Sequence, residues 1–185
     1  MRKTFAFLPL AALLSACAGT PATMAPQPAK PIDAATFYTG TWYEIGRTPV
    51  SVTTNCMAGT TEFYRLPNTQ LMERDACHKG SPEGKERVFR GYVLINNPEN
   101  TKITVHYLLW GVIPFTQRYW MLDHDPAQTW FIVSDPHFTH VDILSRNPRP
   151  TPVQISAWTA EVAALGYDPA NLEFPQLSAP GETGP

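Results

Sequence analysis

Short runs of β-branched and aromatic residues recur along the middle of the chain, separated by clusters of turn-forming residues. In several runs apolar residues occupy alternate positions, which is the period of a strand. Within residues 101–110, for example, Ile103, Val105 and Tyr107 share one face, and aromatic rings occur on both faces of other runs. The pattern predicts eight strands, over residues 40–50, 58–66, 70–77, 85–96, 101–110, 117–125, 129–135 and 140–146.

The apolar period changes after the last predicted strand. Residues 151–165 carry apolar side chains near helical spacing, with Thr151 and Pro152 as cap and first position and Gly166 as the stop. Since the strand connections are of hairpin length, the order favours an antiparallel meander. We therefore predict an all-β fold, an eight-stranded up-and-down β-barrel with one C-terminal α-helix packed outside. A barrel of eight strands is just wide enough to hold one small ligand.

The first 16 residues have the features of a secretory signal peptide. Arg2 and Lys3 precede an apolar run that is too short to span a membrane, and small residues precede Cys17. Residues 14–17, Leu-Ser-Ala-Cys, resemble the lipobox of bacterial lipoproteins, which implies that Cys17 carries diacylglycerol and an acyl chain such as palmitate; the alternative is a buried structural cysteine. Ala18 in place of Asp resembles the outer-membrane sorting pattern. We expect a lipid-anchored protein of the outer membrane that faces the periplasm.

Composition narrows the choice of function. Without Arg2 and Lys3 the chain has 12 basic residues against 16 acidic ones, a balance that argues against nucleic-acid binding. Only 16% of the residues are charged and 43% are hydrophobic, which indicates a large interior. The expected organisation is a signal peptide over 1–16, the lipidated cysteine and a Pro/Ala-rich tether that does not pack over 17–32, one barrel domain over 33–178, and a disordered tail over 179–185.

Three short motifs carry a family resemblance. Residues 40–45, GTWYEI, are similar to the G-x-W-Y-E-I signature of lipocalins, and ILSRNPRP, which contains Arg146, resembles the third lipocalin motif. YWMLDHDP is a weaker match to the second motif and gives Asp123 no role. The resemblance spans residues 34 to about 178 and is strongest to bacterial outer-membrane lipocalins of the apolipoprotein D branch. It implies that Trp42 plugs the closed end of the barrel and that Arg146 stacks on it.

The resemblance also implies a carrier, without a cofactor, that stores or transports a fatty acid or a lysophospholipid in envelope maintenance. A homodimer is compatible with this assignment. We take six polar or aromatic residues as candidates for the ligand-binding wall: Glu44, Tyr64, Tyr92, His106, Tyr107 and Trp120. A haem-binding barrel that uses His106 as its ligand is the alternative binding function.

Two further cysteines, Cys56 and Cys77, flank the hairpin whose turn centres near residues 67–68. They are near cross-strand neighbours, and we expect an oxidising periplasm to join them. The alternative is a catalytic thiol, as in prostaglandin-isomerising lipocalins, but pairing leaves no free thiolate. Three residues are of types that can bind a metal ion: His137, His140 and Asp142. They straddle a turn where solvated polar residues are usual, and we expect no metal site.

Overall fold

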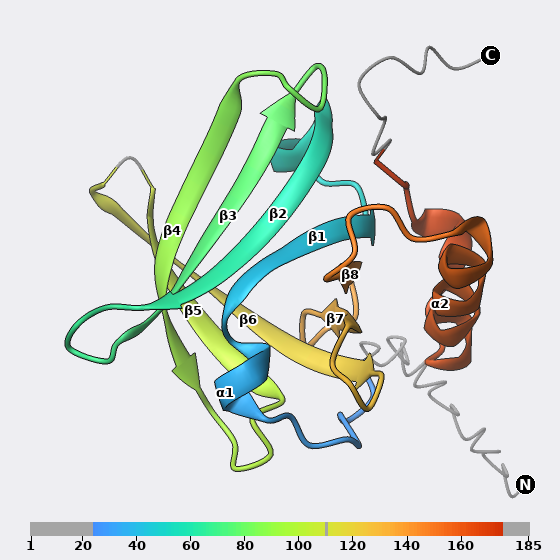
Figure 1. Ribbon diagram of the computed structural model, residues 1–185, viewed down its shortest axis with the longest axis horizontal. Helices are drawn as coiled ribbons and strands as arrows, with labels where there is room; N and C mark the ends of the chain where they lie inside the picture. The colour runs from blue at the N-terminus through green and yellow to red at the C-terminus, as the bar shows by residue number, and fades with distance from the viewer. Residues whose placement is uncertain (1–23, 110, 176–185) are drawn as a thin grey trace, which may run out of the picture.

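The computed structural model describes residues 24–109 and 111–175. Its eight antiparallel strands form one closed barrel in chain order, each pairing with the next and β8 with β1 (Figure 1). The predicted fold class is confirmed. The strands are β1 (Gly40–Arg47), β2 (Cys56–Arg65), β3 (Leu71–Lys79), β4 (Glu86–Ile95), β5 (Lys102–Leu109), β6 (Ile113–His124), β7 (Trp130–Ser134) and β8 (Val141–Ser145).

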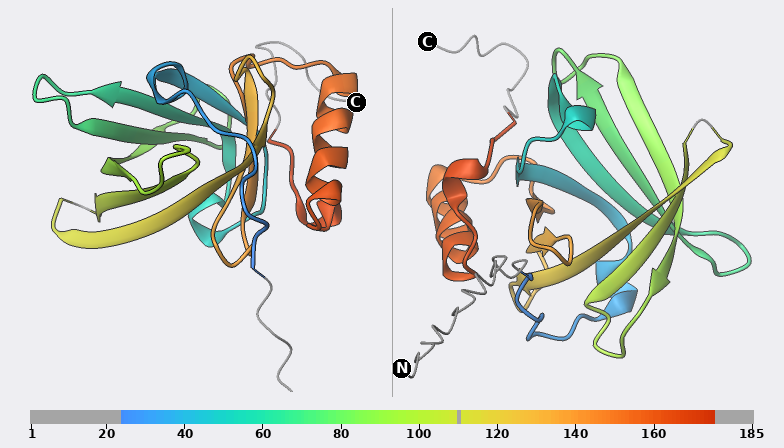
Figure 2. Two further views of the ribbon diagram at one scale, coloured as in Figure 1. Left: turned by 90° about the horizontal axis from the view of Figure 1, so that it is seen from below. Right: turned by 180° about the vertical axis from the view of Figure 1, so that it is seen from behind.

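Four helical segments accompany the barrel: α1 (Ala34–Phe37), η1 (Ser51–Thr53), α2 (Pro152–Ala164) and η2 (Pro169–Asn171). Helix α2 lies outside the barrel, beside the short strands β7 and β8 (Figures 1 and 2). Its N-terminus is capped as predicted, because the Thr151 hydroxyl accepts from the Gln154 amide and Pro152 takes the first position. Gly166 follows the helix with φ of +96°, a conformation that glycine adopts without strain. Among the described residues, no helix has the length and apolar character to span a bilayer.

The buried apolar residues form two separate clusters, one on each side of the barrel wall. The inner cluster fills one end of the barrel and includes Phe37, Trp42 and Phe131. The outer cluster joins the barrel to α2, which contributes Trp158 and Val162. Where the wall separates the two clusters, both of its faces bury apolar side chains. The alternation of apolar and polar residues therefore does not tell the inner face from the outer face there.

Bulges in the sheet change which residues face inward. The pairing of β1 with β8 shifts register between Glu44 and Gly46, and that of β6 with β7 shifts between Met121 and Asp123. In β1, Trp42 and Glu44 face the interior and Ile45 joins the outer cluster. The bulge then returns Arg47 to the interior, three positions after Glu44, where strict alternation would have turned it out.

Residues 24–32, which we call the strap, correct the expectation of a tether that does not pack. The strap has no regular secondary structure, yet Ala25 and Ile32 are buried. The Ala25 amide donates to Pro136 and the Ile32 amide to Glu99. These two main-chain hydrogen bonds and the buried side chains of Ala25 and Ile32 thus hold this Pro/Ala-rich segment on the barrel. The signal peptide, Cys17 and the C-terminal tail lie outside the described residues.

Candidate ligand-binding site

The barrel encloses a cavity of about 510 Å³ that is lined from all eight strands. Six apolar residues of the inner cluster line it: Phe63, Ile103, Met121, Phe131, Val133 and Leu144. Carboxyl and phenol groups follow on the same wall, contributed by β1, β3, β5, β6 and β8. The cavity wall therefore offers apolar and strongly polar groups side by side to the same occupant, since Phe63 pairs in register with Glu73 and Val133 with Asp142.

The end of the barrel beside α1 is closed by Trp42 and Arg146. The guanidinium carbon of Arg146 lies 3.6 Å from the centre of the Trp42 ring, and Arg146 donates to the carbonyl oxygens of Thr41 and Phe37. The Trp42 indole nitrogen also donates to the Phe37 carbonyl at 3.2 Å. Burial lowers the pKa of Arg146 to about 10, so its cation persists at neutral pH. The lid that the resemblance implies for these two residues is what the structure shows.

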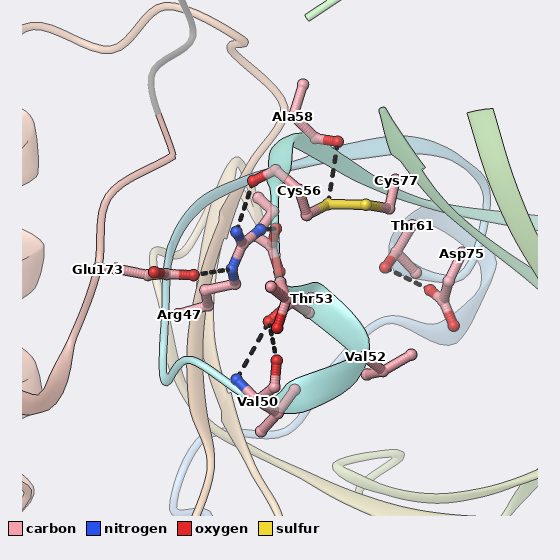
Figure 3. A network of polar contacts seen from close by, with 12 residues as sticks. Arg47, Val50, Val52, Thr53, Cys56, Ala58, Thr61, Asp75, Cys77 and Glu173 are labelled. Carbon is pink, nitrogen blue, oxygen red and sulfur yellow. Dashed lines mark hydrogen bonds and ion pairs between the residues drawn. A yellow bond between two sulfur atoms is a disulfide. The ribbon is translucent and has the colours of Figure 1, made fainter. Parts of the chain in front are cut away.

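Arg47 is the centre of a polar network on the cavity wall (Figure 3). Its guanidinium donates to the carboxylates of Glu44 at 2.5 Å and Glu173 at 2.7 Å, and to the Cys56 carbonyl oxygen at 2.6 Å. Glu44 lies directly against Gly59, where a Cβ atom would collide with its carboxylate. All three guanidinium nitrogens of Arg47 are therefore engaged, and two carboxylates share its single positive charge.

A second polar group joins β3 to β5. The Tyr107 hydroxyl lies 2.6 Å from a carboxyl oxygen of Glu73 and 2.7 Å from one of Asp75, while Thr61 donates to Asp75 at 2.7 Å. One phenolic proton serves only one acceptor at a time, so the two carboxyl groups compete for it. Burial, followed by the charge of Asp75, raises the pKa of Glu73 well above its usual range, and burial also raises the pKa of Asp75. The pair favours holding one proton between its members.

Asp142 faces the cavity from β8, with the outer-cluster residues Val141 and Ile143 on either side of it. Within the part of the chain that the structure describes, its carboxyl group takes part in no hydrogen bond or ion pair, although Asp142 pairs in register with Arg47. Burial, together with the negative charge of Glu44, raises the pKa of Asp142 well above that of an ordinary aspartate. Of the carboxyl groups on the cavity wall, that of Asp142 has the fewest hydrogen-bond and ionic partners.

The cavity wall also carries a disulfide near the start of β2. Cys56 and Cys77 are bonded, with their Cα atoms 5.5 Å apart, and both line the cavity (Figure 3). The predicted pairing is confirmed. It consumes both thiols of the barrel, so the catalytic thiol that an isomerase would require is not offered by either residue.

Two of the six predicted wall residues, Glu44 and Tyr107, line the cavity. The other four, Tyr64, Tyr92, His106 and Trp120, do not. These predictions were wrong because each side chain points to the outer face of its strand. Tyr92 is 43% exposed and stacks on His106 with ring centres 4.6 Å apart. Trp120 packs against the outer cluster beneath Lys102, and Tyr64 follows the inward Phe63 on β2.

The outward position of His106 removes the histidine on which the haem alternative depended. Its imidazole lies against the Thr116 hydroxyl and the Tyr92 ring on the outer wall. His140 and Asp142, considered above as metal ligands, both contact the cavity, yet no cluster of three such residues suited to a metal ion occurs in residues 24–109 and 111–175.

Sequence reasoning missed most of the polar wall. Glu73 and Asp75 share the face of Leu71 and Cys77 on β3, so the buried Leu71 and the paired Cys77 together were a signal that their face points inward. Arg47 could not be found in this way, because the β1 bulge places it inside.

The sequence matches the family model described as a lipocalin-like domain over residues 32–177. No curated protein sequence shows significant similarity to the chain. Among solved structures, insecticyanin from the tobacco hornworm Manduca sexta is 14% identical with a TM-score of 0.63, over 84% of this chain and 87% of that one. The tryptamine complex of the amine-binding protein of Rhodnius prolixus is 14% identical with a TM-score of 0.64, over 83% and 85% of the two chains.

A third similar structure is the major allergen Per a 4 from cockroaches, which is 15% identical with a TM-score of 0.60, over 83% of this chain and 94% of that one. At these identities the structural likeness describes the fold. The family match covers the strap's last residue, the entire barrel and helix α2. The chain therefore belongs to the lipocalin-like domain family.

Proposed function

We propose that the protein is a carrier that holds one small amphipathic molecule inside its barrel. The observation that carries this proposal is the cavity of about 510 Å³ inside a barrel whose one end is closed by Trp42 and Arg146, with six apolar residues of the inner cluster on the cavity wall. A ligand would gain affinity by burying apolar surface there. The polar region of the wall would fix the orientation of its head group.

The lipid classes indicated by the sequence fit this cavity unequally. A fatty acid placed head-first would bring its carboxylate towards Glu73, Asp75 and Asp142, and like charges at short range repel strongly in a poorly solvated site. A lysophospholipid that keeps its head group outside would place only its acyl chain in the cavity. We therefore favour the lysophospholipid of these two.

The second part of the proposal concerns place. A lipid on Cys17 would keep the carrier at the outer membrane and facing the periplasm, where it would store or move amphipathic molecules of the envelope. The sequence over 1–17 supports this part. The Cys56–Cys77 disulfide supports it independently, because disulfides persist in oxidising compartments.

A binding assay with a blocked cavity tests the carrier function. Gln117 lines the cavity from β6, whereas the next residue, Arg118, is exposed on the outer face. Gln117→Trp should fill part of the cavity and abolish saturable binding of the neutral fluorescent probe N-phenyl-1-naphthylamine, while Arg118→Trp should leave binding unchanged. Equal binding by both variants, or no binding by the native protein, would refute the carrier proposal. Native mass spectrometry of protein purified without detergent would then identify a retained ligand by its mass.

A further inference from the structure

The charges on the cavity wall are unbalanced. Four carboxyl groups, those of Glu44, Glu73, Asp75 and Asp142, contact the cavity. Among the lining residues the permanent positive charge is that of Arg47, and its three nitrogens are already occupied by Glu44, Glu173 and the Cys56 carbonyl oxygen. Arg47 therefore makes no ion pair with the other three cavity carboxyl groups, although its charge acts on Asp142.

The protein partly compensates for this imbalance on β3. Glu73, which is 3% exposed, and Asp75 share the Tyr107 hydroxyl, and Asp75 also accepts from Thr61. Neutral donors of this kind stabilise a carboxylate less than a cation does. The pair thus retains acceptor capacity that the described protein groups do not fill.

Asp142 is compensated less directly. It faces the cavity and, in the described part of the chain, makes no hydrogen bond or ion pair with its carboxyl group, although the charge of Arg47, its cross-strand neighbour, acts on it favourably. A carboxylate removed from bulk water without a partner is costly, so a positively charged occupant would relieve the cost directly. The charges of Glu44 and Asp75 both act on Asp142, so such an occupant would also reduce the repulsion among these three groups.

The rest of the wall decides what kind of cation fits. A hydrated metal ion would leave the apolar surface of Phe63, Ile103 and Phe131 uncovered. An organic cation covers that surface with its hydrocarbon body. Tyr107 and Tyr119 line the cavity together with the carboxyl groups, and aromatic rings attract a positive charge placed over them.

We propose that the cavity selects small molecules that combine an apolar body with one protonated amine, and that the ammonium group lies among Asp142, Asp75 and Glu73. This inference rests on the proposed carrier function and names its ligand class. The hydrocarbon body would lie against the apolar wall near the Trp42 lid. An ammonium group has three donors and no acceptor, which matches a site made of carboxylate acceptors.

Competition among three ligands of equal chain length tests the inference. Decylammonium, decanol and decanoate differ chiefly in the charge of the head group, and each would compete with N-phenyl-1-naphthylamine at pH 7. Decylammonium should bind at least about tenfold more tightly than decanol, which is the scale of one charge-assisted hydrogen bond, and decanoate should bind least.

Two matched variants test whether Asp142 causes the preference for decylammonium. Asp142→Asn should reduce the preference for decylammonium over decanol by about tenfold. Glu62→Gln removes a carboxylate from β2 between the inward residues Thr61 and Phe63, hence on the outer face, and should change neither affinity. Thermal unfolding of both variants would confirm that they fold.

The outcomes separate this inference from the carrier function. Equal affinity for the three ligands, or tighter binding of decanoate than of decylammonium, would overturn the amine preference and leave the carrier intact. Failure of every ligand and of the probe to bind would overturn both. A preference for decylammonium that Asp142→Asn does not change would overturn the assignment of the ammonium position.

Discussion

The guanidinium carbon of Arg146, which follows β8, lies 3.6 Å from the ring centre of Trp42, which is buried in β1. The same guanidinium bonds to the Phe37 carbonyl that accepts from the indole nitrogen. Two strands from opposite ends of the barrel sequence and the short helix α1 are thereby joined at one point. We expect this junction to dominate the stability of the closed end.

Substitutions in the lid should have unequal effects on stability. Trp42→Ala removes a large ring with no exposed surface and should lower the free energy of unfolding by about 3–5 kcal/mol. Arg146→Ala loses the stacking contact, the packing of its stem and the hydrogen bonds to Thr41 and Phe37, and should cost about 2 kcal/mol. Urea denaturation measures both, with exposed Arg118→Ala as the control for removal of an arginine. Small and equal changes for the two lid variants would contradict the plug.

The acidic cavity should make stability depend on pH in a defined direction. Burial and neighbouring charges raise the pKa values of Asp142 and Glu73, so the folded state holds more protons than the unfolded state above the ordinary carboxyl range. The free energy of unfolding should therefore be highest in mildly acid solution. It should fall as pH rises from the ordinary carboxyl range through the raised folded values.

Asp142→Asn should remove part of that dependence. At pH 7 the variant should exceed the native protein in free energy of unfolding by about 1 kcal/mol, because Asn removes a negative charge that desolvation and the charge of Glu44 disfavour, and the difference should vanish near pH 4. Urea denaturation from pH 4 to 8 measures this, with Glu62→Gln as the control on the outer face. A variant less stable than the native protein at pH 7 would be evidence that Asp142 has a stabilising partner.

The disulfide should contribute to stability through the unfolded chain. Cys56 and Cys77 are 21 residues apart in sequence, and closing a loop of that length contributes about 3 kcal/mol in the chain-entropy model. The double variant Cys56→Ser, Cys77→Ser should lose about that much free energy of unfolding. Adding a reductant should destabilise the native protein similarly and leave the double variant unchanged. A reductant effect of equal size on both proteins would refute this account.

The lipid anchor proposed at Cys17 can be tested in cells. Cys17→Ser should move the protein from the membrane fraction to the soluble periplasm without changing its unfolding midpoint, since the acyl chains supply the membrane affinity. The Cys56→Ser, Cys77→Ser variant serves as the control for loss of cysteine elsewhere and should stay with the membrane. Continued membrane association of Cys17→Ser after a high-salt wash would exclude the anchor.

The sequence predicted the barrel because its signals are local. Alternating apolar residues, hairpin-length turns and the Thr151 cap each act within a few residues, and together they determine the strands and α2. The largest difference in strand bounds is at β6, which begins at Ile113 rather than near 117. The Trp42–Arg146 contact was also accessible, because two recognisable motifs mark its ends.

The cavity wall was harder to predict because its residues depend on parity and on contacts between distant strands. The rings of Tyr92 and His106 stack on each other on the outer wall, and no pattern within either strand reveals this contact. The bulge in β1 admits Arg47, and the grouping of Glu73 with Asp142 exists only after the barrel closes. Such a group costs stability, and a pattern that favours stable strands does not predict it.

The strap also limits how far the barrel can move from an anchor at position 17. Strap residues from Ala25 onward are fixed to the barrel by the bonds to Pro136 and Glu99 and by the ion pair of Lys30 with Asp123. Only seven residue steps separate Cys17 from Met24, and at no more than about 3.6 Å per residue these reach about 25 Å. A lipid on Cys17 would therefore hold the cavity close to the membrane surface, and a bound molecule would exchange with that leaflet rather than cross the periplasm on its carrier.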